Sequence, residues 1–225
     1  MARLGRLALW AGLVLLFAPT VIIILYRYLD PPVTPLMLLR LAQGQAMNYR
    51  PVPLSRVSPE LIAAVIAAED NRFCRHSGFD AIAMQEEIDT WLEGDRPRGA
   101  STITMQTAKN ILLWPGRDLL RKLIEALLRP QLESLWSKPR ILEVYLGVAE
   151  MGPGVYGAEA ASQAYFDKTA AALGRREAAL LAAVLPNPLE WSAVRPSPRV
   201  ARRASRIMRR AEHIKPLLDC LREHR

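Results

Sequence analysis

A run of about 20 residues without a charged side chain, Leu7 to Tyr26, constrains this chain more than any other feature. A helix of that length, rising ~1.5 Å per residue, covers the ~30 Å hydrocarbon layer of a bilayer. A cleaved signal peptide is the alternative, but its apolar region has only about 7–15 residues. Here the run continues through Val21 to Leu25, and transmembrane helices accept a proline such as Pro19. We therefore expect a retained anchor within residues 1–28.

Basic residues flank this run unequally. Arg3, Arg6 and the terminal amine precede it, whereas Arg27 is the one basic residue close behind it. Because basic flanks stay on the cytoplasmic side, the N-terminus should be cytoplasmic and the rest of the chain should lie outside.

The charge of the chain is concentrated near its C-terminus. The formal net charge is +8, and residues 195–225 contain ten Lys or Arg against three Asp or Glu. A basic helix can bind nucleic acid, but one tethered to a bilayer more readily meets anionic lipid or diphosphate. A solvated helix face fits equally well, and we expect no nucleic-acid partner. Cys74 and Cys220 are too few for a disulfide scaffold and lack metal-site spacing, and the sequence leaves their pairing open.

The chain after the anchor is predicted to be mainly α-helical. Pro31, Pro32 and Pro35 end the anchor helix, and residues 29–56 are predicted to form a juxtamembrane linker and an interfacial segment. Residues 57–225 are predicted to form one domain ending in a basic helix. Its other helices are predicted at Ala81–Leu92, Thr102–Leu113, Leu119–Trp136, Pro139–Ala149, Gly157–Tyr165 and Arg175–Leu185.

The first chemical segment follows a helix that Ser58 caps and Pro59 begins. Its apolar residues recur at helical spacing, so Glu69 and Asp70 fall at the helix C-terminus. The negative end of a helix dipole raises a carboxylate's pKa, which suits a catalytic base. The segment continues with Phe73, His76, Gly78 and Asp80. Two loop caps and a buried histidine would explain the same residues.

Two further segments carry amide, hydroxyl and basic groups. Gly99 opens a turn leading into a helix, and such a turn exposes backbone donors that can hold phosphate oxygens. The polar side chains there are Ser101, Thr102, Gln106, Lys109 and Asn110. Spacing of four then predicts Arg117, Arg121 and Glu125 on one helical face, with Lys122 beside them. A helix cap with a surface lysine would explain the first of these segments without a binding site. Ordinary surface ion pairs would explain the second.

Together with two later segments, these resemble the peptidoglycan glycosyltransferases of family 51, specifically the monofunctional transglycosylases with one membrane anchor. The fourth segment is Ile141–Leu146, which leads through Gly152 and Gly157 to Ala160–Ala161 and Tyr165–Lys168. The fifth is Glu177–Ala182, ending at Leu185–Pro186. The resemblance covers roughly Val57 to Pro188 and rests on five segments in the family's order.

The resemblance implies a lysozyme-like, mostly helical, two-lobed glycosyltransferase domain whose smaller lobe sits partly in the bilayer. By position, Glu69 matches the family's general base and Glu125 its second essential glutamate. The positions that match basic groups around the donor diphosphate are Lys109, Arg117, Arg121 and Lys122. Those that match the cleft are Ser101, Thr102, Gln106 and Asn110. Those that match the first motif, and shape the site more than they react, are Asp70, Phe73, His76, Gly78 and Asp80.

Four positions depart from the family pattern. Met105 stands where a glutamine is usual, Gly147 where asparagine is usual, and Arg129–Pro130 where the helix usually continues with alanine or leucine. Met105 removes one amide contact, and Pro130 should kink its helix. Glu69 and Glu125 are unaffected, so the resemblance still implies activity.

The implied reaction polymerises lipid II, a lipid-linked disaccharide, with inversion and release of undecaprenyl diphosphate. A general base is needed because a sugar hydroxyl is a poor nucleophile, and cations stabilise the leaving diphosphate. No cofactor is expected to be required, and Mg²⁺ is a candidate because it suits diphosphate oxygens.

The same resemblance implies a single-pass protein of the bacterial inner membrane with a periplasmic catalytic domain. Expected partners are lipid II, the nascent glycan strand, the membrane, and other cell-wall synthesis and division proteins. A lysozyme-like lytic enzyme is one alternative, although hydrolysis would not need the cations. A weakly active scaffold of a wall-synthesis complex is the other.

Overall fold

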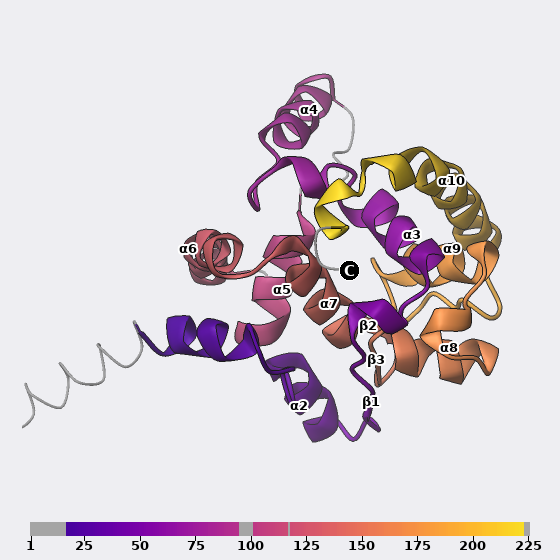
Figure 1. The fold of residues 1–225 in the computed structure, drawn as a ribbon, viewed down its shortest axis with the longest axis horizontal. Helices are drawn as coiled ribbons and strands as arrows, with labels where there is room; N and C mark the ends of the chain where they lie inside the picture. The colour runs from indigo at the N-terminus through magenta and orange to yellow at the C-terminus, as the bar shows by residue number, and fades with distance from the viewer. Residues whose placement is uncertain (1–16, 95–100, 117, 223–225) are drawn as a thin grey trace, which may run out of the picture.

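The computed structural model describes residues 17–94, 101–116 and 118–222, without the side chains of Glu87, Leu119, Leu120, Lys122 and Leu123. Within them the chain is mainly helical, as predicted (Figure 1). After helical residues 17–26 come α2 (Pro35–Ala42), α3 (Pro59–Glu69), α4 (Ala81–Leu92), α5 (Ile103–Leu112), α6 (Leu119–Leu135), α7 (Lys138–Val148), α8 (Ala158–Phe166), α9 (Arg175–Val184) and α10 (Pro198–Ile214). The 3-10 turns are η1 (Leu54–Arg56), η2 (Phe73–Arg75), η3 (Ala170–Ala172), η4 (Lys215–Leu217) and η5 (Asp219–Leu221).

Side-chain caps fix the start of the helices that carry the predicted site. Ser58 Oγ accepts from the Glu60 backbone N–H at 3.2 Å, with Pro59 in the first turn as predicted. Thr102 Oγ1 accepts from Met105 N–H at 3.3 Å, and Asp118 Oδ1 accepts from Arg121 N–H at 2.9 Å. Each cap satisfies a backbone donor that has no partner inside its helix.

A small sheet was not predicted. It consists of β1 (Asn48–Tyr49), β2 (Glu150–Gly152) and β3 (Val155–Tyr156), in the order β1-β3-β2. β1 is parallel to β3, and β2 is antiparallel to it. Strands this short cannot be predicted from the alternation of apolar and polar residues, because that pattern needs about four to eight residues.

The helices form two groups that share one core. α3, α9 and α10 pack against one another, and α5 packs against both α6 and α7. A continuous cluster of buried apolar residues runs through both groups, and its largest fully buried side chains include Tyr145, Phe73 and Leu61. Burying each such side chain contributes roughly 1.5–3 kcal/mol, so the two groups are held in a fixed relation.

A disulfide joins Cys74 to Cys220, which settles the pairing that the sequence left open. It links η2, which lies within the first predicted motif, to η5 beyond α10, across a sequence separation of 146. The end of the basic C-terminal helix is therefore tied to the loop that follows α3.

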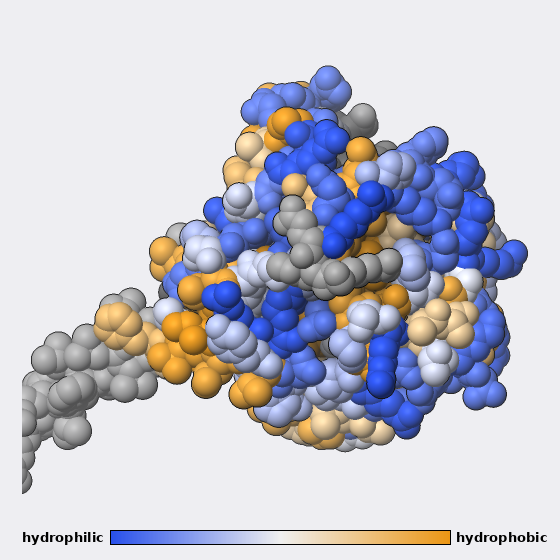
Figure 2. Space-filling view, in the orientation of Figure 1, coloured by the Kyte–Doolittle hydropathy of each residue, from blue (hydrophilic) through white to orange (hydrophobic). Residues whose placement is uncertain are grey.

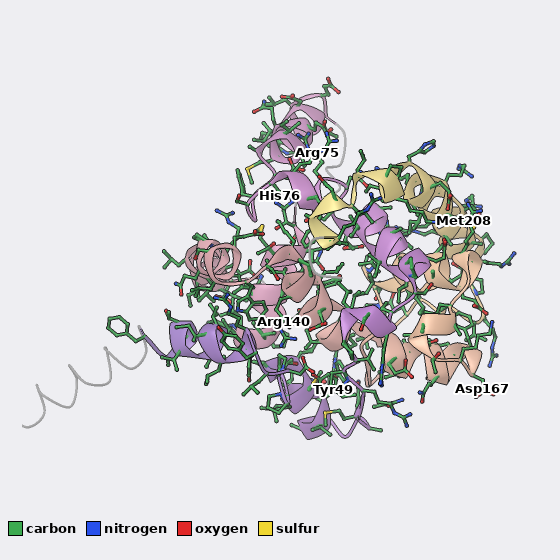
Figure 3. The ribbon with its side chains drawn as sticks, viewed as in Figure 1. Tyr49, Arg75, His76, Arg140, Asp167 and Met208 are labelled. Carbon is green, nitrogen blue, oxygen red and sulfur yellow. A yellow bond between two sulfur atoms is a disulfide. The ribbon has the colours of Figure 1, made fainter. Side chains whose placement is uncertain are left out.

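Arg140, at the start of α7, holds the segment that follows helical residues 17–26 (Figure 3). Its guanidinium donates to the carbonyl of Tyr26 at 2.8 and 3.0 Å and to that of Leu29 at 2.7 Å, and it pairs with Asp30 at 3.0 Å. Trp136 Nε1 also donates to the Ile23 carbonyl at 2.7 Å. Residues 23–30 are thus bound to α6 and α7 rather than free of the domain.

Among the residues that the structure describes, no helix has the length and apolar character needed to cross a membrane. The expected anchor, Leu7–Tyr26, begins before the first described residue. Hydrophobic residues gather around helical residues 17–26 and α2, while hydrophilic ones cover α10 (Figure 2). The exposed apolar side chains in the N-terminal region include Phe17, Val21, Ile24, Leu25, Leu38, Leu39 and Leu41.

Candidate active site

Glu69 is the last residue of α3, as predicted, and Asp70 is its C-cap. The Glu69 side chain is 13% exposed and lies where the two helix groups meet. Gln106 Nε2, from α5, donates to Glu69 Oε2 at 3.1 Å. Arg203 Nη2, from α10, donates to Glu69 Oε1 at 3.3 Å. A carboxylate has about four lone-pair sites, so each oxygen keeps one free to accept a proton.

The pKa of Glu69 is raised above its ordinary value, which was the direction expected. The largest cause is burial, because a low-dielectric surrounding disfavours the charged form. Asp70 raises it further, while the Gln106 hydrogen bond and the charges of Arg203 and Lys109 lower it. Desolvation therefore raises the pKa of Glu69 in the same direction that its place at the helix C-terminus predicts. The result is a carboxylate that is more basic than an ordinary glutamate.

Tyr145 orients the amide that holds Glu69. Its hydroxyl, from α7, donates to Gln106 Oε1 at 3.1 Å, so the other end of that amide faces Glu69 as a donor. Tyr145 is fully buried, and burial, together with Glu69 and Asp70, raises its pKa well above its ordinary value. It therefore remains a protonated donor at working pH.

Lys109 lies between Glu69 on one side and the charged pair Arg121–Glu125 on the other, since all three affect its pKa. Arg121 donates to Glu125 within α6, and both side chains are buried. Burial lowers the pKa of Lys109 most, Arg121 lowers it further, and the two carboxylates raise it. Two cations and two carboxylates thus share one partly buried region.

Arg121 and Glu125 share a face of α6, as predicted, because they lie four residues apart in the helix that begins at Leu119 after the Asp118 cap. Arg117 and Gly99 lie outside the described residues, as does the side chain of Lys122.

The remaining predicted cleft residues have different surroundings. Thr102 is buried, caps α5 and donates to the Gly78 carbonyl at 2.8 Å. Ser101 is exposed just before the helix, and Asn110 is half-buried within it. A separate cavity of about 550 Å³ lies between η1, the starts of α3 and α7, and the C-terminal turns, and none of the predicted site residues lines it.

The first-motif residues form a hydrogen-bond network around Asp70. Asp70 Oδ1 binds His76 Nε2 at 2.8 Å, and Asp70 Oδ2 accepts from Ile103 N–H at 2.9 Å. Gly78 N–H donates to His76 Nδ1 at 3.0 Å, so Nε2 carries the proton in neutral His76. This network connects the end of α3 to the start of α5 and holds Glu69 opposite Gln106.

Asp70, His76 and Asp80 place ligand atoms within 4.8 Å of one another, but each is already engaged. Asp80 caps α4 through Ala83 N–H at 3.0 Å and lies 3.5 Å from Arg72. A histidine and an adjacent arginine do not suit Mg²⁺, which prefers oxygen ligands. Glu125, the other acidic candidate, is paired with Arg121. These side chains therefore fit a structural role better than a metal site.

Other motif residues are explained by packing. Gly78 has φ +82°, and a Cβ there would lie 2.8 Å from side-chain carbons of Arg129 and Glu133. Phe73 is buried and meets the His76 ring edge-on, with centroids 6.5 Å apart. Figure 3 shows His76 in the region between α4 and α5.

The departures from the family pattern leave Glu69 and its contacts intact. Arg129 lies over the Phe79 ring at 4.8 Å, and α6 continues through Pro130 to Leu135. Gly147 has room for a side chain, since its Cβ would meet Pro51 at an ordinary 3.9 Å. Met105 lies in the first turn of α5, and the next residue, Gln106, supplies the amide that contacts Glu69.

Sequence reasoning missed Arg203 and Tyr145. Arg203 was counted only within the basic C-terminal region, although it lies on the inner side of α10 between the buried Val200 and Ile207. Its place among apolar residues at helical spacing was the available signal. Tyr145 was part of the fourth segment but received no role.

Comparison with known proteins identifies the family. Residues 37–212 match the family described as Transglycosylase. The chain is 45% identical over 220 residues to a biosynthetic peptidoglycan transglycosylase of Caulobacter vibrioides, covering 97% of this chain and 96% of that one. It is 51% identical over 204 residues to a protein of the same name from Rhodospirillum centenum, covering 90% and 87%. The chain therefore belongs to the transglycosylase family.

Proposed function

We propose that this protein polymerises the glycan chains of peptidoglycan from lipid-linked disaccharides. The observation that carries this proposal is the position of Glu69, a largely buried carboxylate of raised pKa near Lys109, which in turn lies near the Arg121–Glu125 pair. The names of relatives such as those from Caulobacter vibrioides and Rhodospirillum centenum support the same activity.

The reaction joins an acceptor hydroxyl to the anomeric carbon of the growing chain. Glu69 accepts the proton of the 4-hydroxyl as its oxygen bonds to that carbon. The bond between the anomeric carbon and the diphosphate oxygen breaks, and undecaprenyl diphosphate leaves with the electron pair. One displacement inverts the α-linked donor to a β-linked product.

The leaving diphosphate needs positive charge where its own negative charge develops. Lys109 near Glu69 and Arg121 near Lys109 supply these cations, and Arg117 and Lys122 complete the proposed set. Glu125 holds Arg121 in place within α6 through their buried ion pair. A muramidase would not need such a cluster, and this favours synthesis over lysis.

The bilayer would concentrate enzyme and substrate. Residues 1–28 anchor the chain with its N-terminus in the cytoplasm, and the catalytic domain faces the periplasm. The exposed apolar side chains of residues 17–29 and α2 support a position against lipid. The Cys74–Cys220 disulfide supports an oxidising compartment. Confining two lipid-linked substrates to the same membrane raises their effective concentration.

The proton transfer and the displacement described above use no metal ion. The acidic residues described at the site are engaged by arginine, histidine or backbone donors. If the ion takes part, its ligands come mainly from the substrate's diphosphate oxygens.

Purified full-length Glu69→Gln tests the proposal with lipid-linked disaccharide in detergent or vesicles. We expect polymer formation to fall by at least ~10²-fold, because general-base catalysis contributes about 10²–10⁴-fold. Glu190→Gln, an exposed glutamate on the loop after α9, is the matched control and should keep the wild-type rate. Unchanged polymerisation by Glu69→Gln would refute the assigned base. An inactive wild type would favour a scaffold, and fragments released from mature wall would favour a lytic enzyme.

A further inference from the structure

Arg203 on α10 contacts Glu69 directly. We infer that Arg203 is a positioning residue for the catalytic reaction: its guanidinium fixes the Glu69 carboxylate and keeps it ionised as the attacking hydroxyl approaches. This rests on the proposed function of Glu69 as general base. Arg203 acts through Glu69, so it need not touch the substrate.

The geometry places Arg203 against one carboxylate oxygen and Gln106 against the other. The Arg203 contact is 3.3 Å to Oε1 and the Gln106 contact is 3.1 Å to Oε2. Two donors from different helices restrict rotation of the carboxylate about its last torsion. A base must sit within hydrogen-bond reach of the proton it removes, so this restriction bears on the rate.

Arg203 differs from its neighbours on α10. Its side chain is 29% exposed, whereas Arg202, Arg206 and Arg209 are exposed on the outer side of the same helix. Within the described part of the chain, Arg203 Nε is buried without a hydrogen-bond acceptor. Burying a guanidinium costs free energy unless it is paired, and Glu69 is the carboxylate that pairs it.

The charges facing Glu69 come from several elements. α5 contributes Lys109, the end of α3 contributes Asp70, and α10 contributes Arg203, while Tyr145 on α7 faces it as a neutral hydroxyl. Burial raises the Glu69 pKa, and Arg203 opposes that rise more than Lys109 does. Burial lowers the pKa of Arg203 most, Glu69 raises it, and Arg206, Arg210 and Arg199 lower it further, so positive charge from the same helix lies near this contact.

Helix packing and the disulfide hold Arg203 next to Glu69. α10 packs against both α3 and α9, and the Cys74–Cys220 bond ties the chain beyond α10 to the loop after Glu69. The basic helix is therefore part of the support for the catalytic carboxylate.

The test compares pH–rate profiles of polymerisation for the full-length enzyme and its variants. Removing a cation raises the Glu69 pKa, so Arg203→Ala should lose rate most at low pH and recover as pH rises. An opposite charge at this distance lowers a carboxyl pKa by about 1–3 units when buried. Because Arg203 is partly exposed, we expect the acid limb to move up by roughly 1 unit. Lysine keeps the positive charge but lacks the planar guanidinium with its paired N–H donors. The acid limb of the Arg203→Lys pH–rate profile should therefore stay near that of the wild type, with a lower maximal rate.

Arg209→Ala is the matched control, since it removes an exposed arginine from the outer side of the same helix. It should leave both the rate and the profile unchanged. A uniform loss of rate at all pH values in Arg203→Ala, with no shift of the acid limb, would overturn the inference. If that variant does not fold, Arg203→Lys and Arg203→Gln decide: an acid limb displaced in the glutamine variant alone supports the inference, and identical limbs refute it. Failure of the proposed function is distinguishable, because the wild type itself would then form no polymer.

Discussion

Tyr145→Phe removes one hydroxyl from the chain of contacts that runs from Tyr145 through Gln106 to Glu69. The hydroxyl donates to Gln106 Oε1 at 3.1 Å, and Gln106 Nε2 donates to Glu69 at 3.1 Å. A neutral hydrogen bond contributes about 0.5–1.5 kcal/mol, and leaving a buried acceptor unpaired costs about 1–3 kcal/mol. We expect the free energy of unfolding to fall by about 1–2 kcal/mol. That lowers Tm by roughly 2–8 °C for a chain of this size.

Tyr145→Phe also affects activity, through the side-chain amide of Gln106. Without the Tyr145 hydroxyl, this amide is free to rotate, and its hydrogen bond to Glu69 weakens. That hydrogen bond lowers the Glu69 pKa, so its loss raises the pKa. A base acts when ionised, so activity is present above the pKa and is lost as pH falls through it. We expect a three- to tenfold lower rate near neutral pH, about 0.7–1.4 kcal/mol in activation free energy, and a larger loss at acidic pH.

The measurements are polymer formation across a pH series and thermal unfolding of the purified protein. Tyr165→Phe is the matched control, because Tyr165 lies on α8 against Gly152 and outside this chain of contacts. A wild-type rate and an unmoved acid limb in Tyr145→Phe would refute the view that Tyr145 orients Gln106.

Three further predictions concern other contacts. Lys109→Ala should lower kcat by about 10²–10³-fold, because it removes a group that stabilises developing negative charge. Lys168→Ala, at an exposed lysine, is the control. A wild-type kcat in Lys109→Ala would exclude Lys109 from the diphosphate site. Replacing both Cys74 and Cys220 by serine should lower the free energy of unfolding by about 2–5 kcal/mol. Denaturant unfolding of this variant and of the wild type, with and without reductant, measures the change. An equal free energy of unfolding would show that the disulfide contributes no stability. Arg140→Ala should lower the free energy of unfolding by roughly 1–3 kcal/mol, because the carbonyls of Tyr26 and Leu29 lose their donor. It should also speed proteolysis near residue 30. Equal cleavage rates in the variant and the wild type would contradict this prediction.

Helix positions were readable from the sequence because their signals are local. Ser58–Pro59 and Thr102 mark helix starts through side chains that bond their own backbone, and α4 was placed at its observed limits, Ala81–Leu92. Glu69 at the end of α3 followed from the same periodicity. The motifs in their order then indicated the family, which the comparison with known proteins confirmed.

Contacts between distant segments were decided by tertiary structure. Cys74 pairs with Cys220, Tyr145 reaches Gln106, and Arg203 reaches Glu69 across 134 positions. No local pattern specifies such pairs, because they depend on how α10 packs against α3 and how α5 packs against α7. The basicity of Glu69 has the same origin: the sequence supplied its place at a helix end, but its burial, the larger cause of the raised pKa, exists only once the helices have packed.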